Sequence, residues 1–384
     1  MDFLRSYAAY AGVSEVPAQY TKWCGLATLA ACAEDRVWVE KFRGKKLSPN
    51  LYVFLLGPSG IGKGEAIDTA VRLLTSLPVR IFNGQLTAAA LIDELSSKAK
   101  PPKLLIVSEE LASSIGSGPL ADTLIKLMTK LFAGSDYDYA ERTRTHGPHR
   151  FSKHCLNWIA GTTKEWLRDC VSIEAVRGGF FGRVASVSSV YDLDRRVYRP
   201  VYPIDYEAVE ATLQEHLAQV QMCSGELRLA PDADALLEQW YTERPAPTDE
   251  SMIPTWKREH DLVLRLAMLC SLGDRADGVI HTRHVVAAQR LAAETQAHLP
   301  QLVEYVLLSR ETDGLRQVRE MIRRAHGLPK TAIVKAMAQT GVTYDRVNIY
   351  LDTLTQGGLV GLAKSTNGRP TYVWRGRAAP QEDT

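Results

Sequence analysis

Apolar runs of strand length alternate with segments of helical periodicity over the first half of the chain. A continuous apolar run bounded by turn residues is typical of a strand that is buried on both faces of a parallel sheet. The predicted strands are 51–56, 79–82, 103–107 and 156–163, and the predicted helices are 1–40, 65–77, 87–98 with a Thr87 cap, and 120–132. This alternation predicts an α/β fold with a parallel sheet.

The second half of the chain has a different pattern. After a proline-rich connector at 200–203, Leu, Ala and Val recur about every 3.6 residues, which predicts a helical lid. The predicted lid helices are 207–220, 232–241, 256–272 and 284–308. Shorter helices are predicted at 315–326, 331–340 and 344–356, followed by strands at 359–363 and 371–374 around an Asn367-Gly368 turn. Three helices and a terminal hairpin predict a winged-helix domain.

Charge distribution adds a functional expectation to this pattern. The 384 residues have a net charge of +2, yet residues 314–377 contain eleven Lys/Arg and three Asp/Glu, a net charge of +8. This excess predicts a C-terminal part that binds nucleic acid. The six cysteines form no C-x-x-C pair, which is typical of reduced thiols in a cytoplasmic protein. No apolar run reaches the roughly 18 residues of a membrane span, so no membrane partner is expected.

The first strong strand ends in a glycine-rich turn that closes with a lysine. Three glycines let backbone N–H groups surround phosphate oxygens, and Lys63 can reach the β and γ phosphates. The usual motif G-x-x-x-x-G-K-[ST] supplies a hydroxyl for Mg²⁺ after the lysine, whereas this chain has Gly64 there. The predicted nucleotide-binding residues are Gly57, Pro58, Ser59, Gly60, Ile61, Gly62, Lys63, Gly64 and Glu65.

Two later strands end in polar residues that suit the same site. The strand at 103–107 ends at Glu109-Glu110, or at Ser108-Glu109 if the register shifts by one residue; the general alternative is an ordinary acidic loop. Its position some 45 residues after Lys63 favours the functional interpretation. The strand at 156–163 ends in Thr162 and Thr163, where a polar sensor would lie beside the γ phosphate.

Arginines and basic clusters complete the set of candidate residues. Arg183 follows a glycine-rich turn and is a candidate arginine finger, although a lone arginine is more often a surface residue. Arg258 and Arg265 lie two turns apart on one helix face, so one of them could close on nucleotide, and ordinary surface arginines are the alternative.

Basic residues in two regions are candidates for DNA contact. Those of the first region alternate with aromatic residues in a hairpin-like pattern, for which a solvated charged loop is the alternative. The others flank the predicted recognition helix or lie on the wing, and many winged helices bind only proteins. The candidates are Arg142, Arg144, Arg150 and Lys153, then Lys330, Lys335, Arg346, Lys364 and Arg369.

In this order, the motifs resemble the helicase-type AAA+ ATPases, close to superfamily 3 viral helicases and minichromosome-maintenance-like motors. More specifically, the chain is similar to replication proteins of phages and mobile elements. The resemblance covers about 50–308 and lies in GPSGIGKG (57–64), LLIVSEELASSIG (104–116), YDYAERTRTHGPHRFSKHCLNWIAGTT (137–163), GGFFGR (178–183) and WKREHDLVLRLA (256–267).

The resemblance implies roles for these positions. It implies that Lys63 binds phosphate, that Glu109 holds Mg²⁺ through water and that Glu110 activates the attacking water. It also implies a sensor at Thr162–Thr163, a finger at Arg183 and a second sensor at Arg258. The segment from Arg142 to Lys153 would be a pore hairpin that grips DNA. The two departures from the family pattern, Gly64 and Glu109, both fall on the Mg²⁺ site.

The sequence therefore predicts an AAA+ protein with a C-terminal winged helix. The expected domains are a helical segment (1–48), the ATPase core (49–200), the lid (201–312), the winged helix (313–377) and a disordered tail (378–384). The expected activity is ATP- and Mg²⁺-dependent movement along DNA by a homo-oligomeric ring, most simply a hexamer, in a bacterial host cell, with a primase or polymerase as a further partner. The alternatives are a helicase loader or origin-binding ATPase with slow or no hydrolysis, and a non-enzymatic DNA-binding adaptor.

Overall fold

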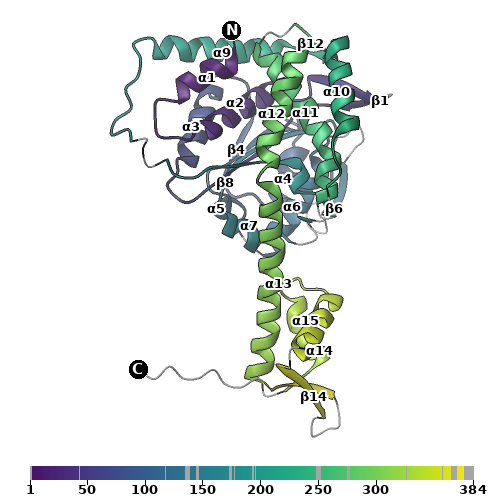
Figure 1. The fold of residues 1–384 in the computed structure, drawn as a ribbon. Coiled ribbons are helices and arrows are strands. Elements are labelled where there is room, and N and C mark those ends of the chain that lie inside the picture. The colour runs from purple at the N-terminus through teal and green to yellow at the C-terminus, as the bar shows by residue number, and fades with distance from the viewer. Residues whose placement is uncertain are drawn as a thin grey trace. The chain divides into compact units, whose positions relative to one another are not determined.

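Figure 1 presents the protein as a computed structural model that describes residues 2–42, 44–116, 118–134, 139–143, 147–172, 175–176, 178–192, 194, 196–247, 252–274, 277–325, 327–356, 358–364 and 370–375. The chain forms two compact units, Met1–Val303 and Glu304–Thr384. The helix α13 (Leu299–Arg324) includes the boundary between them. The sequence pattern predicts one helix that continues to 308, but α12 (Thr282–Gln296) ends earlier, because Pro300 suits only the first turn of a new helix.

A five-stranded parallel sheet lies at the centre of the first unit. Its strand order is β4-β5-β8-β3-β9, with β3 (Tyr52–Leu56), β4 (Ile81–Asn83), β5 (Lys103–Ser108), β8 (Cys155–Thr162) and β9 (Val184–Ser188). The sheet confirms the predicted α/β fold, and β9 is a strand that the pattern did not indicate. Because all strands are parallel, their carboxyl ends meet at one edge and their amino ends at the other. These are called the carboxyl edge and the amino edge below.

Helices cover the sheet, and the N-terminal helices are part of its core. α2 (Ala18–Ala33) is buried almost all round and contacts α1 (Phe3–Ala11), α3 (Lys63–Leu74) and the strands β3, β8 and β9, as expected for a helix that is apolar on every side. Figure 1 shows α1, α2 and α3 close together. The helical segment was predicted to reach 40, but residues Val37–Phe42 form β1, because β-branched and aromatic residues favour a strand.

The helices of the predicted lid share this core. α9 (Tyr206–Met222), α10 (Pro231–Glu243), α11 (Ile253–Asp274) and α12 contribute to the same buried cluster as α1 and α2. The other elements of the unit are β2 (Lys45–Leu47), α4 (Ala88–Ser96), α5 (Leu111–Ile115), α6 (Pro119–Leu131), β6 (Tyr139–Thr143), β7 (Gly147–Phe151), α7 (Lys164–Cys170), η1 (Phe181–Arg183), β10 (Gly225–Glu226), β11 (Arg228–Leu229) and β12 (Val279–Ile280). The predicted Thr87 cap is confirmed, since its hydroxyl accepts from the Ala90 N–H at 3.1 Å.

The second unit has its own small core. Besides α13 it contains β13 (Leu328–Pro329), α14 (Lys330–Ala338), α15 (Tyr344–Gln356), β14 (Val360–Lys364) and β15 (Pro370–Trp374), and its antiparallel sheet has the order β13-β15-β14. Ile333, Met337, Leu351 and Leu354 are among the residues buried between the helices and the sheet. The helices predicted at 331–340 and 344–356 and the paired strands are present. The helix predicted at 315–326 is instead the end of α13, which begins at Leu299, and β13 was not predicted. The Asn367-Gly368 turn lies outside the described residues.

Candidate active site

The residues between β3 and α3 form a tight loop at the carboxyl edge that depends on glycine. Gly60 and Gly62 have φ angles of 80° and 89°, in the left-handed region that residues with a Cβ rarely adopt. Gly57 is needed for another reason, because a Cβ there would lie 2.5 Å from the Tyr20 hydroxyl oxygen. The loop ends at the first turn of α3, whose backbone N–H groups lack helical acceptors and favour an anion.

Lys63 begins α3, and its ammonium group lies within the loop. Nζ donates hydrogen bonds to the carbonyl oxygens of Gly57 and Pro58, both at 2.7 Å. Burial lowers the pKa of Lys63, while the nearby Glu110 carboxylate acts in the opposite direction. The ammonium group is therefore bound by two neutral oxygens, for which phosphate oxygens could substitute with stronger, charge-assisted hydrogen bonds.

Two carboxylates follow β5 at the same edge. A Cβ on Gly161, in the intervening strand β8, would lie 2.4 Å from the Glu109 carbonyl oxygen and 3.3 Å from Lys63 Cβ. The missing side chain at Gly161 thus lets the acidic turn approach the lysine. Ser108 is buried, and its Oγ accepts from Trp158 Nε1 at 3.2 Å. Of the two pairs considered from the sequence, only Glu109–Glu110 has both side chains exposed.

Thr162 and Thr163 end β8 between the loop and the acidic turn. The Thr162 carbonyl accepts from the Gly57 N–H at 3.3 Å, so this strand end is directly beside the loop. The Thr163 hydroxyl caps α7 by accepting from the Trp166 N–H at 3.2 Å, which is a stabilising role in itself. Thr162 is 3% exposed, and its hydroxyl donates to the Thr163 carbonyl oxygen at 3.4 Å.

The donor set at this edge fits Mg²⁺ better than a tightly ligated metal. In the described part of the chain, no group of three or more His, Cys, Asp or Glu side chains is arranged to hold a metal. Mg²⁺ usually keeps several waters and takes one or two carboxylates together with substrate phosphates. Glu109 and Glu110 could supply those carboxylates. A Cβ on Gly64 would meet no heavy atom within 4 Å, so crowding does not explain the missing hydroxyl.

Arg183 and Arg258 lie together, but at the amino edge. Arg183 directly precedes Val184, which pairs with Tyr52 at the start of β3. A Cβ on Gly182 would lie 3.2 Å from Arg258 Cδ. Burial, together with the Arg258 charge, lowers the pKa of Arg183 to about 10. The length of β3, about 13 Å at 3.3 Å per residue, separates this arginine pair from the phosphate loop of the same chain.

Arg265 is neither a surface residue nor a neighbour of the phosphate loop. It is 2% exposed, and its Nη1 donates to the carbonyl oxygen of Asn50 at 3.1 Å, to the Asn50 side-chain oxygen and to the Ser48 carbonyl. Its guanidinium lies 4.6 Å from the centroid of the Phe132 ring, and burial lowers its pKa to about 10. Arg265 therefore fixes the segment that leads into β3, and both earlier interpretations of it were wrong.

The strands β6 and β7 form the antiparallel pair that the pattern of the basic segment predicted. β6 and β7 pair from Tyr139 with Phe151 to Thr143 with Gly147. The Tyr139 and Phe151 rings stack with centroids 4.7 Å apart, so the Tyr139 ring packs within the hairpin. Arg150 and Lys153 are exposed. Arg144 and the side chain of Arg142 lie outside what the structure describes.

The basic candidates of the second unit lie mostly beside α15 instead of on its exposed face. Lys330 and Lys335 belong to α14, and Lys330 Nζ lies 5.1 Å from the centroid of the Tyr344 ring. Arg346 is in the first turn of α15 and is half-buried. The side chain of Lys364 and all of Arg369 lie outside the described residues. The exposed positions of α15 include Tyr344, Asp345, Ile349 and Asp352.

Two tyrosines that the sequence pattern did not indicate bond to the backbone at the end of β3 and in the glycine-rich loop that follows it. The Tyr20 hydroxyl donates to the Leu56 carbonyl at 2.5 Å, and the Tyr191 hydroxyl donates to the Ser59 carbonyl. Tyr191 lies three residues beyond the end of β9, and residues beyond parallel strands gather at the carboxyl edge. Recognition of β9 as a strand would have identified it. Tyr20 is on α2, and no local signal connects that helix with the loop.

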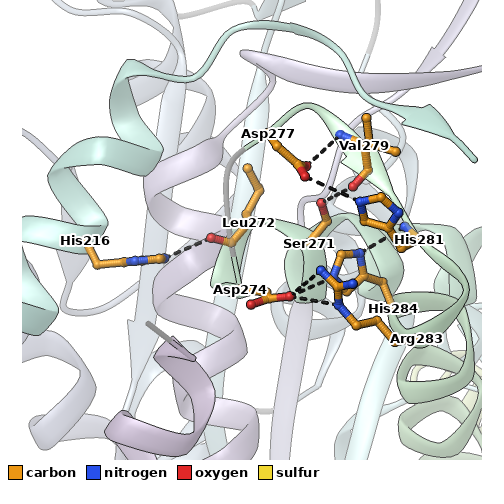
Figure 2. A network of polar contacts seen from close by, with 9 residues as sticks. All are labelled: His216, Ser271, Leu272, Asp274, Asp277, Val279, His281, Arg283 and His284. Atoms are coloured by element: carbon orange, nitrogen blue, oxygen red, sulfur yellow. Dashed lines mark hydrogen bonds and ion pairs between the residues drawn. The ribbon is translucent and has the colours of Figure 1, made fainter.

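A separate polar cluster joins the end of α11 to the start of α12 (Figure 2). The His284 Nδ1 accepts from the His281 N–H at 3.1 Å, and its Nε2 lies 3.4 Å from Asp274 Oδ2, which also accepts from Arg283 Nε at 2.9 Å. These partners assign the neutral tautomer with hydrogen on Nε2. Burial lowers the pKa of His284 despite the Asp274 carboxylate. The cluster stabilises the junction of the two helices.

The sequence matches no model of a protein family and no curated protein. Among the described residues, no helix is both long and apolar enough to cross a membrane.

Proposed function

We propose that this chain is an AAA+ ATPase of the helicase type, a ring-forming motor that uses ATP to move along DNA during replication of a phage or mobile element. The observation that carries this proposal is the meeting of Lys63, the Glu109–Glu110 turn and Thr162 at one edge of a parallel sheet. The strand order, with β8 between the loop strand and the acidic strand, also supports it.

Each residue at the carboxyl edge would have its own role in ATP hydrolysis. Lys63 leaves the two loop carbonyls and binds the β and γ phosphates, and the first N–H groups of α3 bind the same phosphates. Glu109 holds Mg²⁺ through water, and the ion when bound neutralises phosphate charge. Glu110, whose charge already acts on Lys63, orients and deprotonates the attacking water.

The position of Arg183 supports an oligomer. An arginine finger must lie near the γ phosphate to stabilise transition-state charge, and the arginine at the amino edge is a strand length away from its own loop. Arg183, with Arg258 beside it, would therefore serve a nucleotide bound to a neighbouring copy. A closed ring, most simply a hexamer, gives every copy such a neighbour.

DNA would be gripped by the basic hairpin and by the C-terminal unit. Arg150 and Lys153 are exposed on and next to the β6–β7 hairpin, as phosphate contacts require. In the second unit the helix pair α14–α15 and the strands β14–β15 support a winged helix. Its α15 exposes carboxylates, so we assign DNA contact to Lys330 and Lys335 on α14 and a protein partner, such as a primase or polymerase, to α15.

The test is ATP hydrolysis with and without single-stranded DNA, with the mass of the particle measured by light scattering in the presence of nucleotide. DNA-stimulated hydrolysis and a nucleotide-dependent ring are expected. Lys63→Ala should lose hydrolysis and nucleotide binding, and Glu110→Gln should lower the rate about 10² to 10⁴-fold while still binding ATP. The matched control is Lys22→Ala, because Lys22 forms only an exposed ion pair with Glu294. Full activity of Lys63→Ala would refute the motor.

A second candidate function rests on Gly64. The site has room for a hydroxyl but none is present, which suits a helicase loader or origin-binding ATPase that assembles on nucleotide and hydrolyses it slowly. Strand displacement from a forked DNA duplex distinguishes the motor from the loader or origin-binding ATPase, since only a motor separates the strands. A non-enzymatic adaptor would show no ATP binding in calorimetry.

A further inference from the structure

A pocket of about 370 Å³ begins where the phosphate loop ends. Gly64 and Glu65 line it at the first turn of α3, and Asp68 and Thr69 line it one turn further, about 6 Å along the helix axis. The opposite walls include Ser14 and Tyr10 from the N-terminal segment and Tyr202 and Tyr206 from the start of α9 and the residues before it. The pocket therefore continues the phosphate site along α3.

The aromatic wall of the pocket is held in place by its own contacts. The Tyr10 and Tyr206 rings stack with centroids 4.6 Å apart, and Tyr202 meets Tyr206 edge to face at 4.7 Å. Arg72 Nη2 donates to the Tyr10 and Tyr206 hydroxyl oxygens at 2.7 and 2.9 Å. Tyr202 is still 54% exposed, so its ring is available to a ligand.

We infer that this pocket binds the base and ribose of the nucleotide whose phosphates occupy the Gly57–Gly64 loop. The inference rests on the proposed function and extends it to Asp68 and Tyr202 and to residues of the N-terminal segment, Tyr10 and Ser14. A ligand with phosphates on the first turn of α3 has its base within reach of Asp68 and Tyr202. Aromatic rings and a few polar groups in a pocket of this size suit a flat heterocycle.

Asp68 gives the pocket a chemical preference. Its side chain is exposed toward the pocket, and among the described residues it has no hydrogen-bond or ion-pair partner. A carboxylate only accepts hydrogen bonds. It therefore favours a base with an amino group, such as adenine, over hypoxanthine, which has a carbonyl oxygen at the same position.

The experiment is calorimetric titration of the full chain with ATP, inosine triphosphate and inorganic triphosphate, each with Mg²⁺. We expect Tyr202→Ala to weaken ATP binding about tenfold and to leave triphosphate binding unchanged. Asp68→Asn should reduce the preference for ATP over inosine triphosphate by about tenfold, since an amide can also donate. Tyr198→Ala is the control, because Tyr198 lies in the same connecting segment, is 91% exposed and is not part of the pocket.

The outcomes separate the two proposals. If ATP and triphosphate both bind to the unaltered chain but ATP is not weakened by Tyr202→Ala, the pocket assignment is wrong and the phosphate site stands. The pocket assignment is also wrong if the unaltered chain binds ATP no more tightly than inorganic triphosphate. If neither compound binds, the proposed function itself fails.

Discussion

The two edges of the parallel sheet use charged residues in opposite ways. At the carboxyl edge, Glu109 and Glu110 are exposed, and Lys63 is bound only by carbonyl oxygens of its own loop. At the amino edge, Arg265 is buried and bonded to Ser48 and Asn50. Charges at the first edge can rearrange around a ligand, whereas Arg265 is part of the folded framework.

Arg183 and Arg258 are intermediate in burial between the exposed glutamates and the buried Arg265. They are at the amino edge, yet both are half-exposed, and their hydrogen bonds go to carbonyl oxygens of Gly179 and Pro254, at 2.8 Å each. Two like charges close together raise the energy of this edge. An anionic group from another molecule would relieve that repulsion, which is consistent with a role at an interface.

The largest expected effect concerns Arg183. We expect Arg183→Ala to lower hydrolysis about 10³-fold, because a finger in trans stabilises transition-state charge, without loss of ATP binding. Mixing Arg183→Ala with Lys63→Ala should restore part of the activity, because some interfaces then combine an intact loop with an intact finger. Lack of recovery in a mixed assembly that still forms rings would contradict action in trans.

A substitution of Arg265 tests whether the buried arginine at the amino edge stabilises the fold. Arg265→Met should lower the free energy of unfolding by about 3 kcal/mol, since the Ser48 and Asn50 oxygens lose their buried donor. Denaturant unfolding measures the change. Lys257→Met, an exposed position on the same helix, should change stability by less than about 0.5 kcal/mol. If Arg265→Met kept full stability and lost only hydrolysis, the framework role would be incorrect.

A substitution of Gly64 tests whether the carboxyl edge needs a hydroxyl ligand for Mg²⁺ at this position. Gly64→Ser should be accommodated without strain, since a Cβ there meets no heavy atom within 4 Å. If two glutamates and waters already hold Mg²⁺, hydrolysis should change only a few-fold, about 1 kcal/mol or less in the barrier. Steady-state hydrolysis across a Mg²⁺ titration measures this. A gain of about 100-fold or more would mean that the native site is detuned, as the loader alternative requires.

The histidine cluster in Figure 2 includes none of the candidate site residues, and its substitution has the smallest expected effect. Burial holds the pKa of His284 below its ordinary value of 6.5. The unfolded chain therefore takes up a proton first, and stability that is complete above pH 6.5 falls as the pH drops from there through the folded pKa. His154 and His216, whose pKa values burial also lowers, add to the same trend.

His284→Asn isolates this contribution. The amide oxygen can still accept from the His281 N–H but does not titrate, so the loss of stability between pH 7 and 5 should become less steep. Unfolding curves at each pH measure it. Asp274, Asp277, His281 and Arg283 surround the ring and remain in the variant. An unchanged slope of unfolding free energy against pH would show that His284 does not contribute to the pH dependence.

The local sequence pattern was sufficient to predict an element or a turn where one physical cause dominated. The runs at β3, β5 and β8 are continuous because both faces of a parallel strand are buried, and the loop glycines follow from left-handed φ angles at Gly60 and Gly62. The short, half-apolar β9 lacked such a signal, and its absence from the prediction also concealed Tyr191.

The sequence by itself determined the α/β class, the glycine-rich loop with its lysine, the acidic pair after β5, and α14, α15, β14 and β15 of the C-terminal unit. Only the tertiary structure decided which of these residues meet. Arg258 and Arg265 share a helix face in the sequence pattern, yet one lies beside Arg183 and the other is buried against Asn50. Tyr10, Tyr20 and Tyr202 lie beside α3 and its loop because α1, α2 and the segment before α9, all distant from that loop in sequence, pack there. Periodicity reports which side of an element is apolar, whereas the partner of a side chain depends on packing between elements, which no local pattern contains.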